Sequence, residues 1–245
     1  MGRENVFQEI AERLSKNELT RIVAAGSTNT DKSSLTEGAA VWLDWLDVMI
    51  SGKYGRVHHV INTASSGQTS SEMLEFFSRD VLSYNPEILI LTAGEDDCDR
   101  QNDISVEQFT ENLKAMIGKA RESAPGVIIV LQTSPGFDSE MLSGDGEEGK
   151  AEAHKLYMDA VRETAKSENC LLSDIFERME LLRGAYPDEY RELMQDSCTL
   201  NATGHMLWGI DLGELFGGKL PESQELYCEE GLDFQSLLDN LSEEE

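Results

Sequence analysis

The feature that most constrains this chain is its alternation of short apolar runs with longer segments whose apolar residues recur at helical spacing. The run Ile88–Leu91 is unbroken, as is typical of a parallel strand covered on both faces. Strands are expected at 21–25, 57–61, 88–91, 127–131 and 170–172. This alternation predicts an α/β fold, a three-layer, doubly wound parallel sheet of flavodoxin-like type with helices on both faces.

The expected helices separate these strands. Apolar residues recur every three or four positions within 1–16, 42–49, 73–81, 109–117, 151–166 and from 201 onwards. A chain of 245 residues with 40% apolar content is long enough to bury one full core. We therefore predict one α/β domain over residues 1–220.

Residues 221–245 form an acidic tail with nine acidic residues and no basic ones. Phe234, Leu237, Leu238 and Leu241 nevertheless lie at helical spacing. We predict a short amphipathic helix that docks on the domain or on a second copy, so a homo-oligomer formed through the tail is one expectation.

The formal net charge of -27 is the extreme value in the composition. Such a field repels phosphate backbones and anionic headgroups, which argues against nucleic acid and membrane partners. No stretch approaches the roughly 18 to 20 apolar residues that span a bilayer, and residues 1–16 lack the apolar core of a signal peptide. The four cysteines show no paired or zinc-like spacing. A cytoplasmic protein with reduced thiols is expected.

Ligands of doubly wound sheets bind outside the carboxyl ends of the strands. Four polar segments fall at such positions in this chain: 26–28, the loop ending at Gly67, 94–97, and 196–199 just before the last long helix. Their order and spacing resemble those of the SGNH (GDSL-type) hydrolase, or lipase-acylhydrolase, family over roughly residues 20–215. In that family the first block reads Gly-Asp-Ser, the third Gly-x-Asn-Asp and the last Asp-x-x-His.

The resemblance is good outside the reactive atoms. Gly26, Gly67 and Gly94 match the family glycines, Asp196 matches the acid of the last block, and 201–204 resembles the helix start that follows it. Gly67 and Gly94 either supply backbone donors to a ligand or permit tight turns, and both readings stay open.

The departures fall on the residues that carry the family's chemistry. Thr28 stands where the nucleophilic serine belongs and Ser27 where the aspartate precedes it. Asp96 replaces the oxyanion-hole asparagine, and Thr199 stands where the general-base histidine belongs. An ionised Asp96 only accepts hydrogen bonds, so it repels a developing oxyanion that asparagine would stabilise.

A hydroxyl is a weak nucleophile until a neighbouring base takes its proton. His205 is an outside candidate for that base, although its place after 201–204 puts it inside the last helix. His58 is expected in the core or at the surface, and His154 on a helix surface.

Three functions follow. The one we favour is a degraded ester-hydrolysis site that binds a small ligand or a protein partner through Gly26, Ser27, Gly67, Gly94, Asp96 and Thr199. In the second, Thr28 attacks a small ester, lipid or acetylated sugar with His205, Asp196 or His58 as base. In the third, Glu95, Asp96, Asp97 and Asp99 hold a divalent metal ion through oxygen ligands. The favoured reading assigns no cofactor and no metal.

Overall fold

Five parallel strands form the centre of the computed structural model, which describes residues 7–35, 39–138, 140–141 and 149–243. The strands lie in the order β2-β1-β3-β4-β5. Their bounds are β1 (Thr20–Ala25), β2 (His58–Asn62), β3 (Ile88–Thr92), β4 (Ile128–Gln132) and β5 (Leu171–Ser173). Each lies within one or two residues of an expected apolar run, and the predicted parallel sheet is confirmed.

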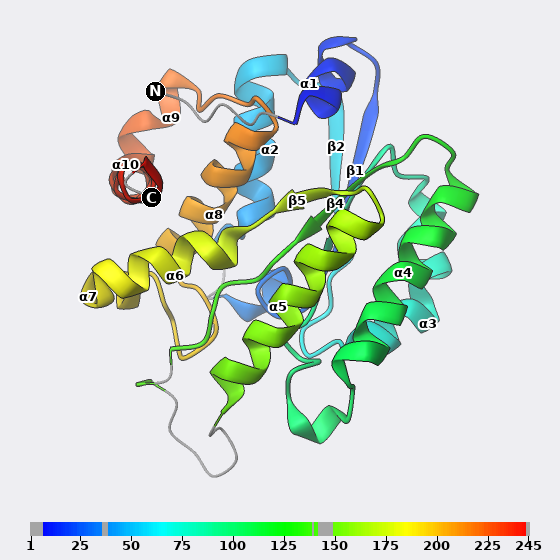
Figure 1. Ribbon diagram of the computed structural model, residues 1–245. Coiled ribbons are helices and arrows are strands. Elements are labelled where there is room, and N and C mark those ends of the chain that lie inside the picture. Colours follow the sequence, from blue (N-terminus) through cyan, green and yellow to red (C-terminus); the bar gives the residue numbers. More distant parts are fainter. Residues whose placement is uncertain (1–6, 36–38, 139, 142–148, 244–245) are drawn as a thin grey trace.

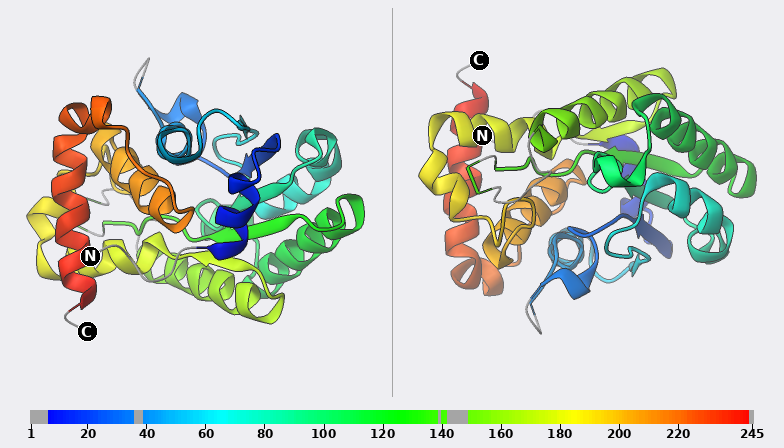
Figure 2. Two further views of the ribbon diagram at one scale, coloured as in Figure 1. Left: turned by 90° about the horizontal axis from the view of Figure 1, so that it is seen from above. Right: turned by 90° about the horizontal axis from the view of Figure 1, so that it is seen from below.

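Helices cover both faces of the sheet, as Figures 1 and 2 show. The bounds are α1 (Gln8–Ser15), α2 (Trp42–Tyr54), α3 (Ser70–Asp80), α4 (Val106–Ser123), α5 (Lys150–Ser167), α6 (Ile175–Ala185), α7 (Pro187–Arg191), α8 (Ala202–Leu215), α9 (Glu222–Glu225) and α10 (Glu229–Glu243). Helices α3, α4 and α5 pack on one face, and α2 and α8 on the other. The three-layer α/β architecture expected from the sequence is therefore confirmed.

The strands bury side chains on both faces because successive residues point in opposite directions. Ile22 and Ala24 of β1 join the core under α2 and α8, whereas Val23 and Ala25 join the core under α3 to α5. Every residue of β3 is buried. This double coverage explains why the central strands are continuous apolar runs rather than alternating ones.

The direction of winding reverses between β1 and β3, which are neighbours although β2 lies between them in the sequence. Loops that leave the carboxyl ends of two such strands diverge to opposite faces and leave a ligand crevice between them. Here these loops are residues 26–30 and 93–97. The expected site therefore lies between the loop after β1 and the loop after β3.

The C-terminal helix α10 packs against α6 and α8 at one side of the molecule, as Figure 1 shows. Phe234 and Leu238 of its apolar face are buried. The amphipathic helix expected in the acidic tail thus forms and docks on the same chain. Across the described residues, no helix is both long enough and apolar enough to cross a membrane.

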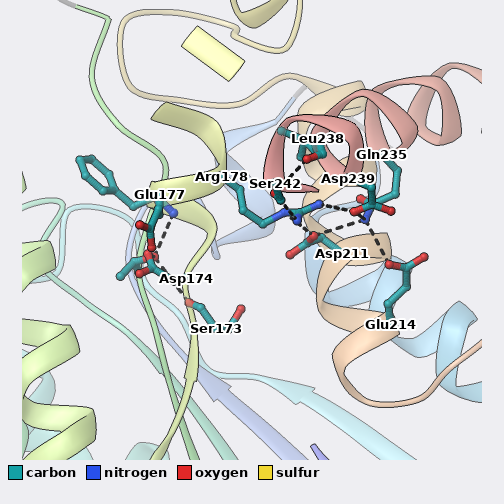
Figure 3. A network of polar contacts seen from close by, with 12 residues as sticks. Ser173, Asp174, Glu177, Arg178, Asp211, Glu214, Gln235, Leu238, Asp239 and Ser242 are labelled. Carbon is teal, nitrogen blue, oxygen red and sulfur yellow. Dashed lines mark hydrogen bonds and ion pairs between the residues drawn. The ribbon is translucent and has the colours of Figure 1, made fainter. Parts of the chain in front are cut away.

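A buried arginine anchors α10, and Figure 3 shows its polar network. Arg178 of α6 forms ion pairs with Asp211 of α8 at 2.9 Å and with Asp239 of α10 at 2.7 Å. It also donates to the Ser242 hydroxyl at 3.2 Å, and the Gln235 amide donates to Asp211 at 3.4 Å. One cation therefore joins three helices in a region where the chain is strongly acidic.

Replacing Arg178 by methionine is expected to lower the free energy of unfolding by about 3–5 kcal/mol, because it leaves the buried Asp211 carboxylate without its cation. Asp239→Asn, which removes only one partner, is expected to have a smaller effect. Urea unfolding followed by circular dichroism measures both. The matched control is Arg79→Met, an exposed arginine paired with the neighbouring Asp80, which should change stability by less than about 0.5 kcal/mol. Equal stabilities of Arg178→Met and wild type would contradict this role.

Candidate functional site

The Thr28 hydroxyl faces the loop that follows β2. Its Oγ1 lies 3.1 Å from the Ser66 hydroxyl oxygen and accepts a hydrogen bond from the Gly67 backbone N–H at 3.2 Å. Gly67 has φ of 76°, a left-handed conformation that favours glycine and turns its N–H toward Thr28. The structure thus brings together two predicted site residues, a partly exposed hydroxyl and a backbone donor.

Ser27 and Asp96 join the loops after β1 and β3 directly. The buried Ser27 hydroxyl donates a hydrogen bond to the Asp96 carboxylate. Burial raises the pKa of Asp96, and the hydrogen bond from Ser27 opposes that shift. Asp96 therefore has one carboxylate oxygen committed to Ser27, at the position where the resemblance places an oxyanion donor.

Gly26 and Gly94 shape the same two loops. The Gly26 carbonyl accepts from the Ser65 N–H at 3.2 Å, which ties the β1 loop to the β2 loop. Gly94 has φ of 111°, and a Cβ there would lie 2.7 Å from the Met158 methyl carbon. Position 94 therefore needs glycine for the turn itself, which favours the turn reading there.

The Asn29 side chain connects three loops of the site. Its amide nitrogen donates to Glu95 Oε1 at 3.1 Å and to the Cys198 carbonyl at 2.8 Å, and its amide oxygen accepts from the Leu200 N–H at 2.9 Å. Its backbone N–H also donates to Glu95 Oε2 at 3.2 Å. Sequence reasoning assigned Asn29 no role. Its place directly after Thr28 in the first polar block was the available signal.

Glu95 is a buried carboxyl group directly behind this site. Burial raises its pKa from 4.5 to about 7, opposed by hydrogen bonds from Asn29 and Ser134. Ser134, which follows β4, also lies 2.9 Å from Nε2 of His154. His154 is fully buried between Phe137 and Phe176, and burial lowers its pKa to about 3. His154 was expected on the surface of its helix, α5, and that prediction was wrong.

Asp196 folds back on its own loop. Its Oδ1 accepts hydrogen bonds from the backbone N–H of Cys198 at 2.9 Å and of Thr199 at 2.7 Å. Thr199, which stands where the resemblance places a histidine, is buried and carries no titratable group. Burial and the Asp196 charge raise the pKa of Cys198 to about 12, so its thiol stays protonated at neutral pH.

The proposed alternative bases do not reach Thr28. His205 is fully buried in α8, where its Nδ1 accepts from the Trp42 N–H at 3.4 Å and its ring stacks on Trp208. Burial lowers the pKa of His205 to about 3, so it remains neutral. His58 lies at the amino end of β2, opposite the carboxyl ends where the site forms, and is bonded to Asp47 at 2.7 Å.

The four carboxylates of the predicted metal cluster point to different partners. Glu95 faces Asn29, and Asp96 faces Ser27. Asp97 accepts from the backbone N–H at the start of α3, and Asp99 pairs with Lys150 at 3.4 Å. Among the described residues, no three or more histidine, cysteine, aspartate or glutamate side chains converge to hold a metal ion. The geometry gives the metal hypothesis no support.

Comparisons with known proteins bear on the family and the fold of this chain. The sequence model of the GDSL-like lipase/acylhydrolase family matches residues 24–207. No curated protein matches the chain.

Solved structures share the fold at low identity. An acetylxylan esterase from Geobacillus stearothermophilus (Axe2) is 17% identical, with 83% of this chain and 97% of that chain covered and a TM-score of 0.67. The lipase/acylhydrolase from Enterococcus faecalis is 22% identical, with 83% and 99% covered and a TM-score of 0.66. Catalytic mutants of Axe2 replace a serine, an aspartate and a histidine, the last two being three positions apart.

Asn29→Ala is expected to lower the free energy of unfolding by about 2–4 kcal/mol, because it removes three side-chain hydrogen bonds, one of them to a buried carboxyl. The matched control is Asn102→Ala, which removes one bond to the Asp96 carbonyl from an exposed residue and should cost less than about 1 kcal/mol. Denaturant unfolding compares the two. Equal losses would show that Asn29 does not hold the loops together.

Glu95 is expected to give stability a specific pH dependence. Between pH 4.5 and 7 the folded carboxyl keeps its proton while the unfolded one loses it, so the folded state binds more protons and stability falls as pH rises. Glu95→Gln removes this effect. The stability of Glu95→Gln relative to wild type should therefore rise by about 3 kcal/mol from pH 4.5 to 8. A difference that stays constant with pH would contradict the raised pKa.

Proposed function

The chain belongs to the GDSL-like lipase/acylhydrolase family, and we propose that its site binds a small ester- or carbonyl-bearing ligand without cleaving it. The observation that carries this proposal is the environment of Thr28. Its hydroxyl bonds to the Ser66 hydroxyl and to the Gly67 N–H, and neither of these two groups acts as a base at neutral pH. A ligand at Thr28 therefore meets hydrogen-bonding groups around a hydroxyl that its two partners do not activate.

Ester cleavage of the family type needs a base that takes the proton of the attacking hydroxyl. The position three residues after Asp196 holds Thr199, whereas in the Axe2 catalytic mutants a histidine lies three residues after an aspartate. Removing the base histidine of a serine protease costs roughly 10⁶-fold in turnover. Losing one oxyanion donor, as at Asp96, typically costs about 10²- to 10³-fold more. Together these losses leave essentially no turnover.

The groups that would hold a ligand remain. The Gly67 N–H and the hydroxyls of Thr28 and Ser66 lie together at the carboxyl end of the sheet. The Gly67 N–H is bound to Thr28, and the two hydroxyls share one hydrogen bond, so one hydroxyl proton remains to donate to a carbonyl or hydroxyl oxygen. Because one fold neighbour is an acetylxylan esterase, acetylated xylo-oligosaccharides are the first ligands to test. A protein partner whose loop presents a carbonyl group is a second candidate for the same donors.

A slow hydrolase that uses Thr28 is the competing function. The observation in its favour is the partly exposed Thr28 hydroxyl beside a backbone N–H, the pairing expected of a nucleophile and an oxyanion donor. It lacks a base, and the branched Cβ of threonine restricts the rotation that an attacking hydroxyl needs.

Wild type is expected to hydrolyse p-nitrophenyl acetate no faster than Thr28→Ala. A rebuilt variant carrying Ser27→Asp, Thr28→Ser, Asp96→Asn and Thr199→His should exceed wild type by at least about 100-fold, since it regains nucleophile, base and oxyanion donor. Initial rates measured by absorbance test both.

The matched control is the same variant without Thr199→His, which should stay near the wild-type rate. Wild type should also bind an acetylated xylo-oligosaccharide in a calorimetric titration and release it with its acetyl groups intact by mass spectrometry. Clear wild-type turnover that disappears in Thr28→Ala would contradict the proposal.

A further inference from the structure

A pocket whose lining does not include Thr28 lies between α2 and the edge strand β2. It holds about 390 Å³, within the range of small-ligand pockets. Its charged and titratable lining consists of Lys32, Asp44, Asp47, Arg56, His58 and His59. We call this feature the α2–β2 groove.

The acceptors of the groove are already engaged. Asp44 pairs with Lys32 and also accepts from the Val41 N–H at 3.1 Å. Asp47 accepts from His58 at 2.7 Å. This hydrogen bond, together with the nearby charges of His58, Arg56 and His59, lowers the pKa of Asp47, so that carboxylate stays ionised. Both acids in the groove therefore already accept hydrogen bonds from groups of the protein itself.

The donors of the groove are not all engaged. Arg56 and His59 are exposed, and among the described residues their side chains make no hydrogen bond or ion pair. A molecule that enters meets a guanidinium, which only donates hydrogen bonds, and an imidazole, which has one N–H donor in its neutral form.

We propose that the α2–β2 groove binds a small oxyanion, a carboxylate or a phosphate, through Arg56 and His59. The guanidinium fork matches two oxygens of either anion, which a lysine ammonium does not. The chain as a whole carries -27, but exposed charges more than about 8–10 Å away are largely screened at physiological salt. The charge of the expected ligand therefore depends on the groups that line the groove, and those without a hydrogen-bond partner among the described residues, Arg56 and His59, favour an anion. This site is independent of the function proposed for Thr28.

The chain's four histidines provide the test, since two line the groove and two are buried elsewhere. The full chain is titrated with inorganic phosphate, and separately with acetate, at constant ionic strength while the imidazole ¹H–¹³C signals are recorded. We expect the His59 signal to shift and saturate while His154 and His205 stay in place. Phosphate without acetate identifies a tetrahedral anion, and acetate identifies a carboxylate.

Arg56→Gln should weaken the binding at least about tenfold. The matched control is Arg79→Gln on α3, another exposed arginine, which should leave the affinity unchanged. Absence of saturation with both anions, equal shifts of all four histidines, or an unchanged affinity in Arg56→Gln would overturn the proposal.

Discussion

The Asn29 amide is the interaction on which the geometry of this site depends. It joins the loop after β1 to the loop after β3 through Glu95, and to the 196–200 loop through Cys198 and Leu200. These loops are far apart in the sequence, and this one side chain bonds to both of the partner loops. Because the bonds are buried, they are strong and costly to lose. They fix the place of Thr28 whether or not Thr28 does any chemistry.

The sheet makes this arrangement possible. Strands β1 and β3 are neighbours whose loops diverge, so the polar residues that follow them meet at one edge. One hydrophobic core lies between the sheet and α3–α5, and the other lies between the sheet and helices α2 and α8. The ion pair between Arg178 and Asp239 holds α10 against the side of the molecule that contains α2 and α8. The framework of a GDSL-like lipase/acylhydrolase is thus intact around a site whose reactive groups differ.

The sequence analysis located the strands and the polar blocks because apolar runs and their following loops are local signals. It missed α6, although Ile175, Met179 and Leu182 recur there at helical spacing. It also missed the buried chain from Asn29 through Glu95 and Ser134 to His154. Those residues come from four separate segments, and burial, which decides their role, has no local signature. His154 was assigned to a surface for the same reason.

We propose that the family framework remains while the means of activating Thr28 is gone. The most direct measurement is intact-mass spectrometry of the protein after incubation with a fluorophosphonate ester, which forms a covalent bond with an activated hydroxyl. We expect the wild-type mass to stay unchanged after prolonged incubation, because a hydroxyl without a base is a weak nucleophile. A stoichiometric adduct that peptide mapping places on Thr28 would show an activated nucleophile and would contradict it.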